Sequence, residues 1–241
     1  MNAIETKGLT KLYGQKTALD KLDLTVKEGE LFALLGVNGA GKTTTIKLLS
    51  CLMSPTSGSA SIYGHDILTH AHDARSLLAT SPQETAVAPN LTARENLEMM
   101  AGIYGANLPQ SKEKATRMIK EFNMSSIEHT RAKKLSGGWQ RRLSIAMALI
   151  SEPKLLFLDE PTLGLDVLAR RELWAIIRAL KGKTTIILTT HYLEEAESLS
   201  DRIGILAGGK LAALGTAPEL IAQSGAKNFE DAFITLAGGM A

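Results

Sequence analysis

The feature that most constrains this chain is a glycine-rich turn between an apolar run and a helical pattern. Residues 36–43 read Gly-Val-Asn-Gly-Ala-Gly-Lys-Thr, which fits the pattern G-x-x-x-x-G-K-[ST]. The turn follows the apolar run 31–35, which is typical of a buried parallel strand, and precedes a helical run over residues 44–52. A strand, a glycine turn and a helix in this order predict an α/β fold with a phosphate-binding loop.

The residue types of this loop predict how a nucleotide binds. Glycines allow consecutive backbone N–H groups to turn inward around phosphate oxygens, and the helix N-terminus adds positive potential. We expect Lys42 to contact the β- and γ-phosphates and the Thr43 hydroxyl to ligate Mg²⁺. The alternative is a glycine-rich turn with an incidental lysine, which a match to the full pattern disfavours. The residues expected to bind nucleotide here are Gly36, Val37, Asn38, Gly39, Ala40, Gly41, Lys42, Thr43 and Thr44.

Two later apolar runs also end in polar side chains. Residues 155–158 lead to Asp159 and Glu160, and residues 184–190 lead to His191. Because ligands of open parallel sheets gather at the carboxyl ends of the strands, we expect these groups beside the glycine-rich loop. Asp159 would hold Mg²⁺, Glu160 would take a proton from an attacking water, and His191 would contact the γ-phosphate. The alternatives are an acidic strand end that caps the next helix, and a structural histidine.

The middle of the chain has a helical pattern. Thr92-Ala-Arg-Glu95 has the form of a capping box, and a later helix is expected from near Ser136 until before Pro153. Residues 203–214 read as a hairpin with a Gly-Gly turn. We therefore predict a mostly parallel sheet with a helical insertion over residues 86–150.

A second anion-binding segment opens the later helix. Leu135 is followed by Ser136, Gly137 and Gly138, which offer a hydroxyl, two unobstructed backbone N–H groups and a helix dipole. The alternative is a capping serine with two flexible glycines. One chain therefore carries two segments suited to phosphate, about a hundred residues apart.

With the glycine-rich loop upstream and the acidic strand downstream, this LSGG segment resembles the signature of the ABC ATPase family, and the resemblance covers nearly the whole chain. It implies a P-loop NTPase core with a mostly parallel sheet, a small antiparallel β portion and an inserted helical subdomain. It also implies that the chain binds ATP with Mg²⁺ and hydrolyses it. Tyr13 falls where the family stacks an aromatic ring on adenine, and Asp166 matches the D-loop.

The resemblance also implies roles and partners. Gln83 matches the loop that links the metal site to the helical subdomain. It would ligate the metal together with Thr43 and Asp159, and it would join Glu160 and His191 in catalysis. The family implies a homodimer or heterodimer of nucleotide-binding domains, in which the LSGG segment of one copy closes over ATP held by the other. It further implies separate integral membrane permease subunits.

Two residues depart from the family pattern. Trp139 stands where glutamine is usual, and Val167 where proline is frequent. Neither change removes a hydroxyl, a charge or a glycine on which the site depends, so we expect activity to persist. We expect Trp139 to pack against the protein, and contact with the ribose is the alternative.

The resemblance implies one ABC ATPase domain over residues 1–241. Residues 1–85 and 151–225 would form a RecA-like core with its β-subdomain, 86–150 the helical subdomain, and 226–241 a short tail. The sequences Leu91–Leu97 and Asn228–Phe233 look like those of small ABC-2-type exporters. The alternatives are a soluble ABC ATPase, for example of the iron–sulfur-assembly type, and a regulatory module without turnover.

Composition limits partners and location. A net charge of +2 gives no general nucleic-acid surface, so no nucleic acid partner is expected. The single cysteine, Cys51, suits a reducing compartment. The sequence has no run of about 20 apolar residues and no apolar segment near the start, so we expect neither a membrane span nor a secretory signal. We expect a cytoplasmic protein, held peripherally on the inner face of the cell membrane by its partner.

Overall fold

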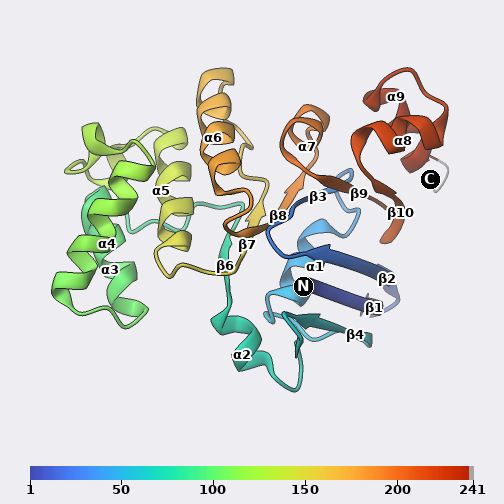
Figure 1. The fold of residues 1–241 in the computed structure, drawn as a ribbon, viewed down its shortest axis with the longest axis horizontal. Helices are drawn as coiled ribbons and strands as arrows, with labels where there is room; N and C mark the ends of the chain where they lie inside the picture. Colours follow the sequence, from blue (N-terminus) through green and yellow to red (C-terminus); the bar gives the residue numbers. More distant parts are fainter. Residues whose placement is uncertain (239–241) are drawn as a thin grey trace.

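The computed structural model describes residues 1–238 and contains two β-sheets with helices around them (Figure 1). The larger sheet has the strand order β10-β9-β3-β8-β7-β6 and is parallel except for its edge strand β10. Its strands are β3 (Leu31–Leu35), β6 (Leu78–Ser81), β7 (Leu155–Asp159), β8 (Thr185–Thr190), β9 (Arg202–Ala207) and β10 (Lys210–Gly215). The smaller sheet is antiparallel with the order β2-β1-β4-β5. Its strands are β1 (Asn2–Tyr13), β2 (Lys16–Lys27), β4 (Ser57–Ile62) and β5 (His65–Asp66).

Helices form separate groups at the two ends of the molecule. In Figure 1, α3, α4 and α5 stand at one end of the molecule, and α8 and α9 stand at the other. Their bounds are α1 (Lys42–Leu49), α2 (Ala71–Ser76), α3 (Ala93–Ile103), α4 (Leu108–Glu121), α5 (Gly137–Leu149), α6 (Val167–Leu180), α7 (Leu193–Leu199), α8 (Ala217–Ser224) and α9 (Phe229–Gly238), with the short 3₁₀ turns η1 (Ser125–Ile127) and η2 (Ala132–Lys134). Across residues 1–238, no helix combines the length and the apolar character that crossing a bilayer requires.

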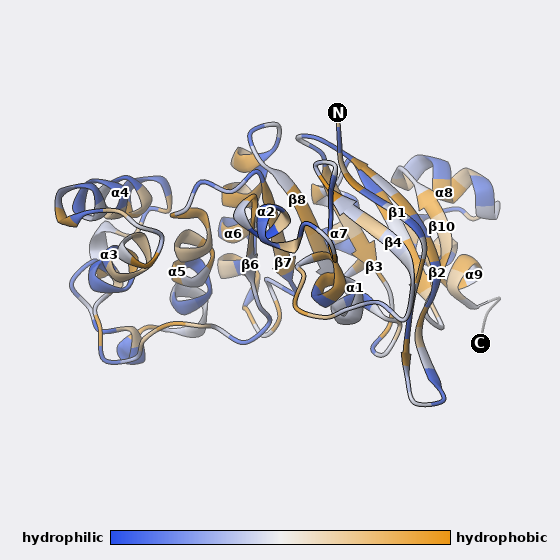
Figure 2. Cartoon of the chain, turned by 90° about the horizontal axis from the view of Figure 1, so that it is seen from below, coloured by the Kyte–Doolittle hydropathy of each residue, from blue (hydrophilic) through white to orange (hydrophobic). Residues whose placement is uncertain are grey.

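Strand β3 shows how the two faces of the larger sheet are covered. Side chains alternate between the faces of a strand, and all five residues of β3 are buried. Phe32 and Leu34 pack with α1, which lies between the two sheets, whereas Ala33 and Leu35 pack with α7, α8 and α9 on the other face. A strand covered on both sides must be apolar throughout, which is why this run carries no polar alternation. The central strands are accordingly the most hydrophobic part of Figure 2, whereas α4 carries much hydrophilic surface.

Most of the elements expected from the sequence are present. The three apolar runs are strands β3, β7 and β8, residues 203–214 form the hairpin of β9 and β10, and Thr92 opens α3 with a complete capping box. The expected helix over residues 44–52 was wrong at its far end, because α1 stops at Leu49. There Cys51 has φ +56°, a left-handed conformation that turns the chain out of the helix. Of the expected tail, residues 229–238 form α9, and residues 239–241 lie outside the described residues.

Candidate nucleotide-binding and catalytic site

Four parallel strands end side by side and deliver their polar residues to one edge of the larger sheet. Leu35 of β3 is in register with Thr190 of β8, and Asp159 of β7 with Thr189. The residues that follow these strand ends are the glycine-rich loop, His191 and Glu160, while Gln83 follows β6 on the far side of β7. The sheet topology therefore brings together groups that are more than a hundred residues apart in the sequence.

Two glycines of the loop are required by close backbone contacts. Gly41 precedes α1 with φ +109°, and a Cβ atom there would stand 2.6 Å from the carbonyl oxygen of Ala18. A Cβ atom on Gly36 would stand 2.5 Å from the carbonyl oxygen of Leu206. Both distances are far below van der Waals contact, so any larger residue would push the loop away from its place. The strand-to-helix turn can thus present its backbone N–H groups at the helix N-terminus.

Lys42 is held inside this loop by three oxygen atoms. Its Nζ donates to the carbonyl oxygens of Gly36 at 2.7 Å and Val37 at 3.3 Å, and it lies 3.4 Å from Oε1 of Glu160. The residue is 5% exposed. A buried ammonium needs such partners, because an unpaired charge in the interior is strongly unfavourable. The oxygens of a bound triphosphate would compete with Glu160 for this ammonium.

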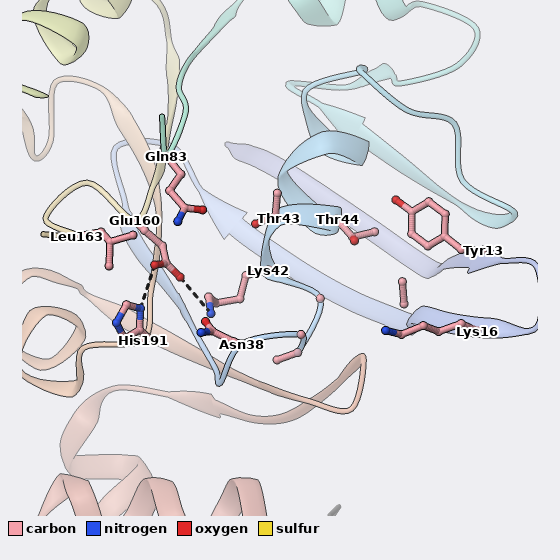
Figure 3. A pocket seen from close by; sticks show the side chains of 14 residues that line it. Tyr13, Lys16, Asn38, Lys42, Thr43, Thr44, Gln83, Glu160, Leu163 and His191 are labelled. Carbon is pink, nitrogen blue, oxygen red and sulfur yellow. Dashed lines mark hydrogen bonds and ion pairs between the residues drawn. The ribbon is translucent and has the colours of Figure 1, made fainter. Parts of the chain in front are cut away.

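Glu160 joins the lysine to the histidine. Its Oε2 lies 3.0 Å from Nδ1 of His191, so one carboxylate oxygen faces Lys42 and the other faces His191 (Figure 3). Its backbone N–H donates to the carbonyl and hydroxyl oxygens of Thr189. Glu160 has φ +46°, which costs a residue with a side chain conformational energy. The neighbouring β8 strand and the ion pairs hold the carboxylate in this orientation.

Around these side chains is a cavity of about 520 Å³, a size in the range of small-molecule sites. Residues that the sequence predicted and that line the cavity are Tyr13, Asn38, Gly39, Ala40, Gly41, Lys42, Thr43, Thr44, Gln83, Glu160 and His191. Three lining residues were not predicted, namely Lys16, Ala18 and Leu163. Lys16 and Ala18 follow Tyr13 on the second strand of the same hairpin, and the alternation along β2 is the sequence signal that indicates this pairing.

Tyr13 stands at the end of the cavity away from Glu160 (Figure 3). The residue is 46% exposed, its hydroxyl donates to Sδ of Met53 at 3.0 Å, and Nζ of Lys11 lies 5.6 Å from the ring centroid. The hydroxyl contact orients an otherwise exposed ring. An exposed, oriented aromatic face at this end of the cavity suits stacking with a planar base.

The metal ligands expected from the sequence lie in two places. Thr43 and Gln83 line the cavity, whereas Asp159 is buried behind it, where its Oδ1 accepts a hydrogen bond of 2.5 Å from the Thr189 hydroxyl. Residues 1–238 contain no group of three or more His, Cys, Asp or Glu side chains that could hold a metal without other ligands. A hydroxyl, an amide and one carboxylate are oxygen donors that fit Mg²⁺ only together with oxygens from the nucleotide phosphates.

The loop that carries Gln83 is fixed by α5. Arg141 of α5 is 4% exposed and donates to the backbone oxygen of Pro82 at 2.5 Å and to that of Gln83. Burial lowers the pKa of the Arg141 guanidinium, and the nearby charge of Asp159 opposes that effect. The buried guanidinium donates to two successive carbonyl oxygens, and it thereby links α5, the helix of the LSGG segment, to the cavity wall. The sequence interpretation did not include Arg141.

The signature residues are not part of the cavity of their own chain. Ser136 stands at the N-cap of α5, and a Cβ atom on Gly138 would meet Ala169 of α6 at 3.2 Å. Asp166 caps α6 by accepting a hydrogen bond of 2.9 Å from the backbone N–H of Ala169. The predicted residues outside the cavity lining are Gly36, Val37, Ser136, Gly137, Gly138, Asp159 and Asp166. The nucleotide roles predicted for the LSGG segment and Asp166 therefore remain predictions that need a second molecule.

Trp139 packs within its own chain. The residue is partly buried against the core cluster of α3, α4, α5 and α6, and the guanidinium carbon of Arg142 lies 4.3 Å from its ring centroid. Arg142 also forms an ion pair with Glu172 of α6. These contacts agree with the predicted packing role.

Comparisons with known proteins agree with this geometry. Residues 19–163 match the family model described as ABC transporter. The daunorubicin/doxorubicin resistance ATP-binding protein DrrA of Streptomyces peucetius is 42% identical over 224 residues, which are 92% of this chain and 68% of DrrA. The probable multidrug ABC transporter ATP-binding protein YbhF of Escherichia coli K12 is 44% identical over 222 residues, which are 92% of this chain and 38% of YbhF.

Solved structures show the same fold. The ATP-binding subunit of an ABC transporter superposes with a TM-score of 0.85 at 32% identity, covering 97% of this chain and 99% of that one. A dimeric ATP-binding cassette in a post-hydrolysis state, bound to ADP and phosphate, superposes with a TM-score of 0.79 at 26% identity and covers 88% of this chain and 98% of its own. The chain belongs to the ABC transporter ATP-binding family.

Proposed function

We propose that this protein hydrolyses ATP and thereby drives export of a substrate through separate transmembrane subunits. The observation that carries the proposal is the single carboxylate of Glu160, placed between Lys42 and His191 at a cavity of about 520 Å³. The relatives DrrA and YbhF are named for drug resistance and multidrug transport, which supports the exporter class over a soluble ABC ATPase.

The chemistry proposed for the site divides among its residues. The backbone N–H groups of the loop and Lys42 would bind the β- and γ-phosphates, and Tyr13 would stack on adenine. Glu160 would accept a proton from a water that attacks the γ-phosphorus, while the bond from that phosphorus to the β–γ bridging oxygen breaks and ADP leaves. His191 would contact the γ-phosphate from the other side of Glu160.

Magnesium would be held by the Thr43 hydroxyl, the Gln83 side chain and the Asp159 carboxylate, together with phosphate oxygens. When bound, the ion neutralises negative charge on the β- and γ-phosphates and so favours attack by water. The hydrogen bonds from Arg141 to the Gln83 loop would couple the contact between Gln83 and magnesium to the position of α5.

We also propose a division of the chain into a catalytic core, a helical subdomain and a tail. Residues 1–85 and 151–225 would form the catalytic core, 86–150 the helical subdomain and 226–241 the tail. The Ser136–Gly138 helix N-terminus does not line its own cavity, so it would serve the γ-phosphate held by a second nucleotide-binding subunit, identical or different. A related cassette is dimeric with ADP and phosphate, which supports this arrangement. We further propose a cytoplasmic location at the inner face of the membrane, by attachment to integral permease subunits.

Two measurements test the proposal. Purified protein with Mg·ATP should release phosphate, and Glu160→Gln should not. An affinity-tagged chain solubilised from its native membranes should then co-purify with an integral membrane protein of several spans. No phosphate release from the wild type would refute the ATPase assignment. Phosphate release with co-purification of soluble partners alone would instead favour an ABC ATPase that is not coupled to transport.

A further inference from the structure

A fully buried carboxylate lies on α7, the helix that follows His191 of the Glu160–His191 pair. Glu195 belongs to α7, four residues after His191, and has no exposed surface. Its Oε1 accepts two hydrogen bonds, one of 2.8 Å from the Thr162 hydroxyl and one of 3.0 Å from Nε1 of Trp174. All three side chains are buried.

Keeping this acid in the interior carries a clear cost. Burial raises the pKa of the Glu195 carboxyl, and the hydrogen bonds from Thr162 and Trp174 together with the charge of Arg170 counteract part of that rise. Its second oxygen, Oε2, has no hydrogen-bond partner, and among the described residues it shares that condition only with Nε of Arg170. An apolar side chain would avoid the penalty of an unpaired buried oxygen, so a fold that retains the acid points to a task for it.

The two donors lead to the catalytic pair. Thr162 is two residues after Glu160, in a turn where the N–H of Leu163 donates to the Glu160 carbonyl oxygen at 3.2 Å. Glu195 itself lies on the helix that starts directly after His191 and Tyr192. Oε1 of Glu195 therefore links the turn after Glu160 to α7, the helix that follows His191.

Trp174 adds the third element. Trp174 lies on α6, and its indole N–H donates to the same Oε1 atom of Glu195. With Thr162 and Trp174 both bonded to Glu195, the turn after β7, the middle of α6 and the start of α7 meet at one point.

We propose that Glu195 is a positioning residue, which holds Glu160 and His191 at their 3.0 Å separation by accepting hydrogen bonds from Thr162 and Trp174. The inference rests on the proposed ATPase function, since the pair it positions is the one assigned to proton transfer and phosphate contact. Glu195 does not line the cavity and touches no substrate.

Substitution of the acceptor tests this role. Glu195→Met keeps the length of the side chain but removes the acceptor, so the Thr162 turn and α7 lose their common anchor. We expect kcat for ATP to fall about 10- to 100-fold, as small displacements of a catalytic group do. KM for ATP should stay within about twofold, because ground-state binding by Lys42 and the glycine loop is unchanged. Glu195→Gln retains a carbonyl oxygen for both donors and should restore kcat to within about threefold of the wild type.

A matched control separates positioning from general destabilisation. Leu199→Ala removes a side chain that is 2% exposed on the same helix, and it leaves the bonds to Glu195 in place. It should lower the melting temperature but leave kcat unchanged when assayed well below that temperature. The ¹⁵N chemical shift of the His191 ring, which reports its contact with Glu160, should move in Glu195→Met and not in Leu199→Ala.

Each result has a defined meaning. If Glu195→Met keeps wild-type kcat and an unchanged His191 signal, or if Leu199→Ala lowers kcat equally, the positioning role is refuted. If Glu195→Met does not fold, Thr162→Val removes one donor with little change of shape and should give the same kcat-only defect to a smaller degree. A wild type without ATPase activity would refute the proposed function, and the His191 signal would still decide whether Glu195 positions the pair.

Discussion

At the scale of single residues, the site depends on how one carboxylate is shared. Glu160 faces Lys42 with one oxygen and His191 with the other. A group in this place can bind through either oxygen while it acts as a base with the other. Changes at Glu160 and at Lys42 should therefore affect different steps.

Glu160→Gln should abolish turnover and preserve binding. The amide keeps the size of the side chain but cannot accept the proton of water, so phosphate release should fall by about 100-fold or more. Calorimetry should find Mg·ATP affinity no weaker than in the wild type, because Lys42 loses its competing carboxylate. Glu113→Gln, an exposed position of α4, is the matched control and should be fully active. Normal turnover of Glu160→Gln would contradict the assignment of the base.

Lys42→Ala should weaken nucleotide binding itself. Loss of a charge-assisted contact to phosphate lowers affinity by roughly 10- to 100-fold, which titration calorimetry with Mg·ATP measures. Lys47→Ala removes an exposed lysine from the same helix and should bind as the wild type does. Equal affinities for Lys42→Ala and the wild type would place the nucleotide elsewhere.

The sequence predicted the residues that form the cavity better than those that support it. Lys42, Glu160 and His191 follow apolar strands, and their shared position is visible in the pattern. Glu195 lies in the run Leu-Glu-Glu-Ala-Glu, which reads as an exposed acidic helix. Its spacing to Ala196 and Leu199 does place it on the buried face, but the donors that make burial tolerable come from distant segments.

At the scale of elements, the strand ends determine the site and the helix caps stabilise its surroundings. Short, fully apolar strands could be predicted because both faces of the central sheet are covered. The long strands β1 and β2 could not be delimited in the same way. Bulges shift their pairing at several points, so apolar residues do not keep a strict period of two along β1.

The capping box of α3 gives a test at this scale. Thr92 and Glu95 each bond to the other's backbone N–H. We expect Thr92→Ala to lower the free energy of unfolding by about 1 kcal/mol, measured by denaturant titration at neutral pH. The exposed helix residue Ser198→Ala serves as control and should change it little.

The same box should respond to acid. Bonds from the backbone N–H of Thr92 and then from its hydroxyl lower the pKa of Glu95 below the ordinary 4.5. A lowered pKa stabilises the fold above the unfolded value of 4.5 and loses that effect as pH falls through the folded pKa. The wild type should therefore have a larger free energy of unfolding than Glu95→Gln at neutral pH, and this difference should disappear as the pH is lowered below 4.5. An advantage independent of pH would contradict this account.

At the scale of the whole molecule, one chain contains two helix N-termini that are predicted to bind anions and that do not share a cavity. The glycine loop and Lys42 are in the cavity, and Ser136–Gly138 are outside it. The helical insertion was predictable from its period, but the sequence alone gives no distance between these two segments. That distance depends on how α5 packs against α6 and on the bonds of Arg141 to the Gln83 loop.

Dimerisation that depends on ATP is the prediction at this scale. Glu160→Gln with Mg·ATP should sediment as a dimer, because uncleaved nucleotide would join the loop of one copy to the LSGG segment of another. Adding Gly137→Asp to that variant should keep it monomeric, since a carboxylate would occupy the anion site. The fold should tolerate this change, because a Cβ atom at Gly137 meets nothing within 4 Å. A persistent monomer of Glu160→Gln with ATP would argue against the nucleotide-bridged dimer.

The left-handed backbone at Glu160 favours glycine, whereas the proposed chemistry requires a carboxylate at the same position. Glycine would adopt this conformation without strain, but like glutamine it leaves no carboxylate to take a proton. At this position, a substitution with glycine that relieves the backbone strain also removes the proposed catalytic base. We expect a relative that no longer hydrolyses ATP to tolerate glycine at this position, directly after β7.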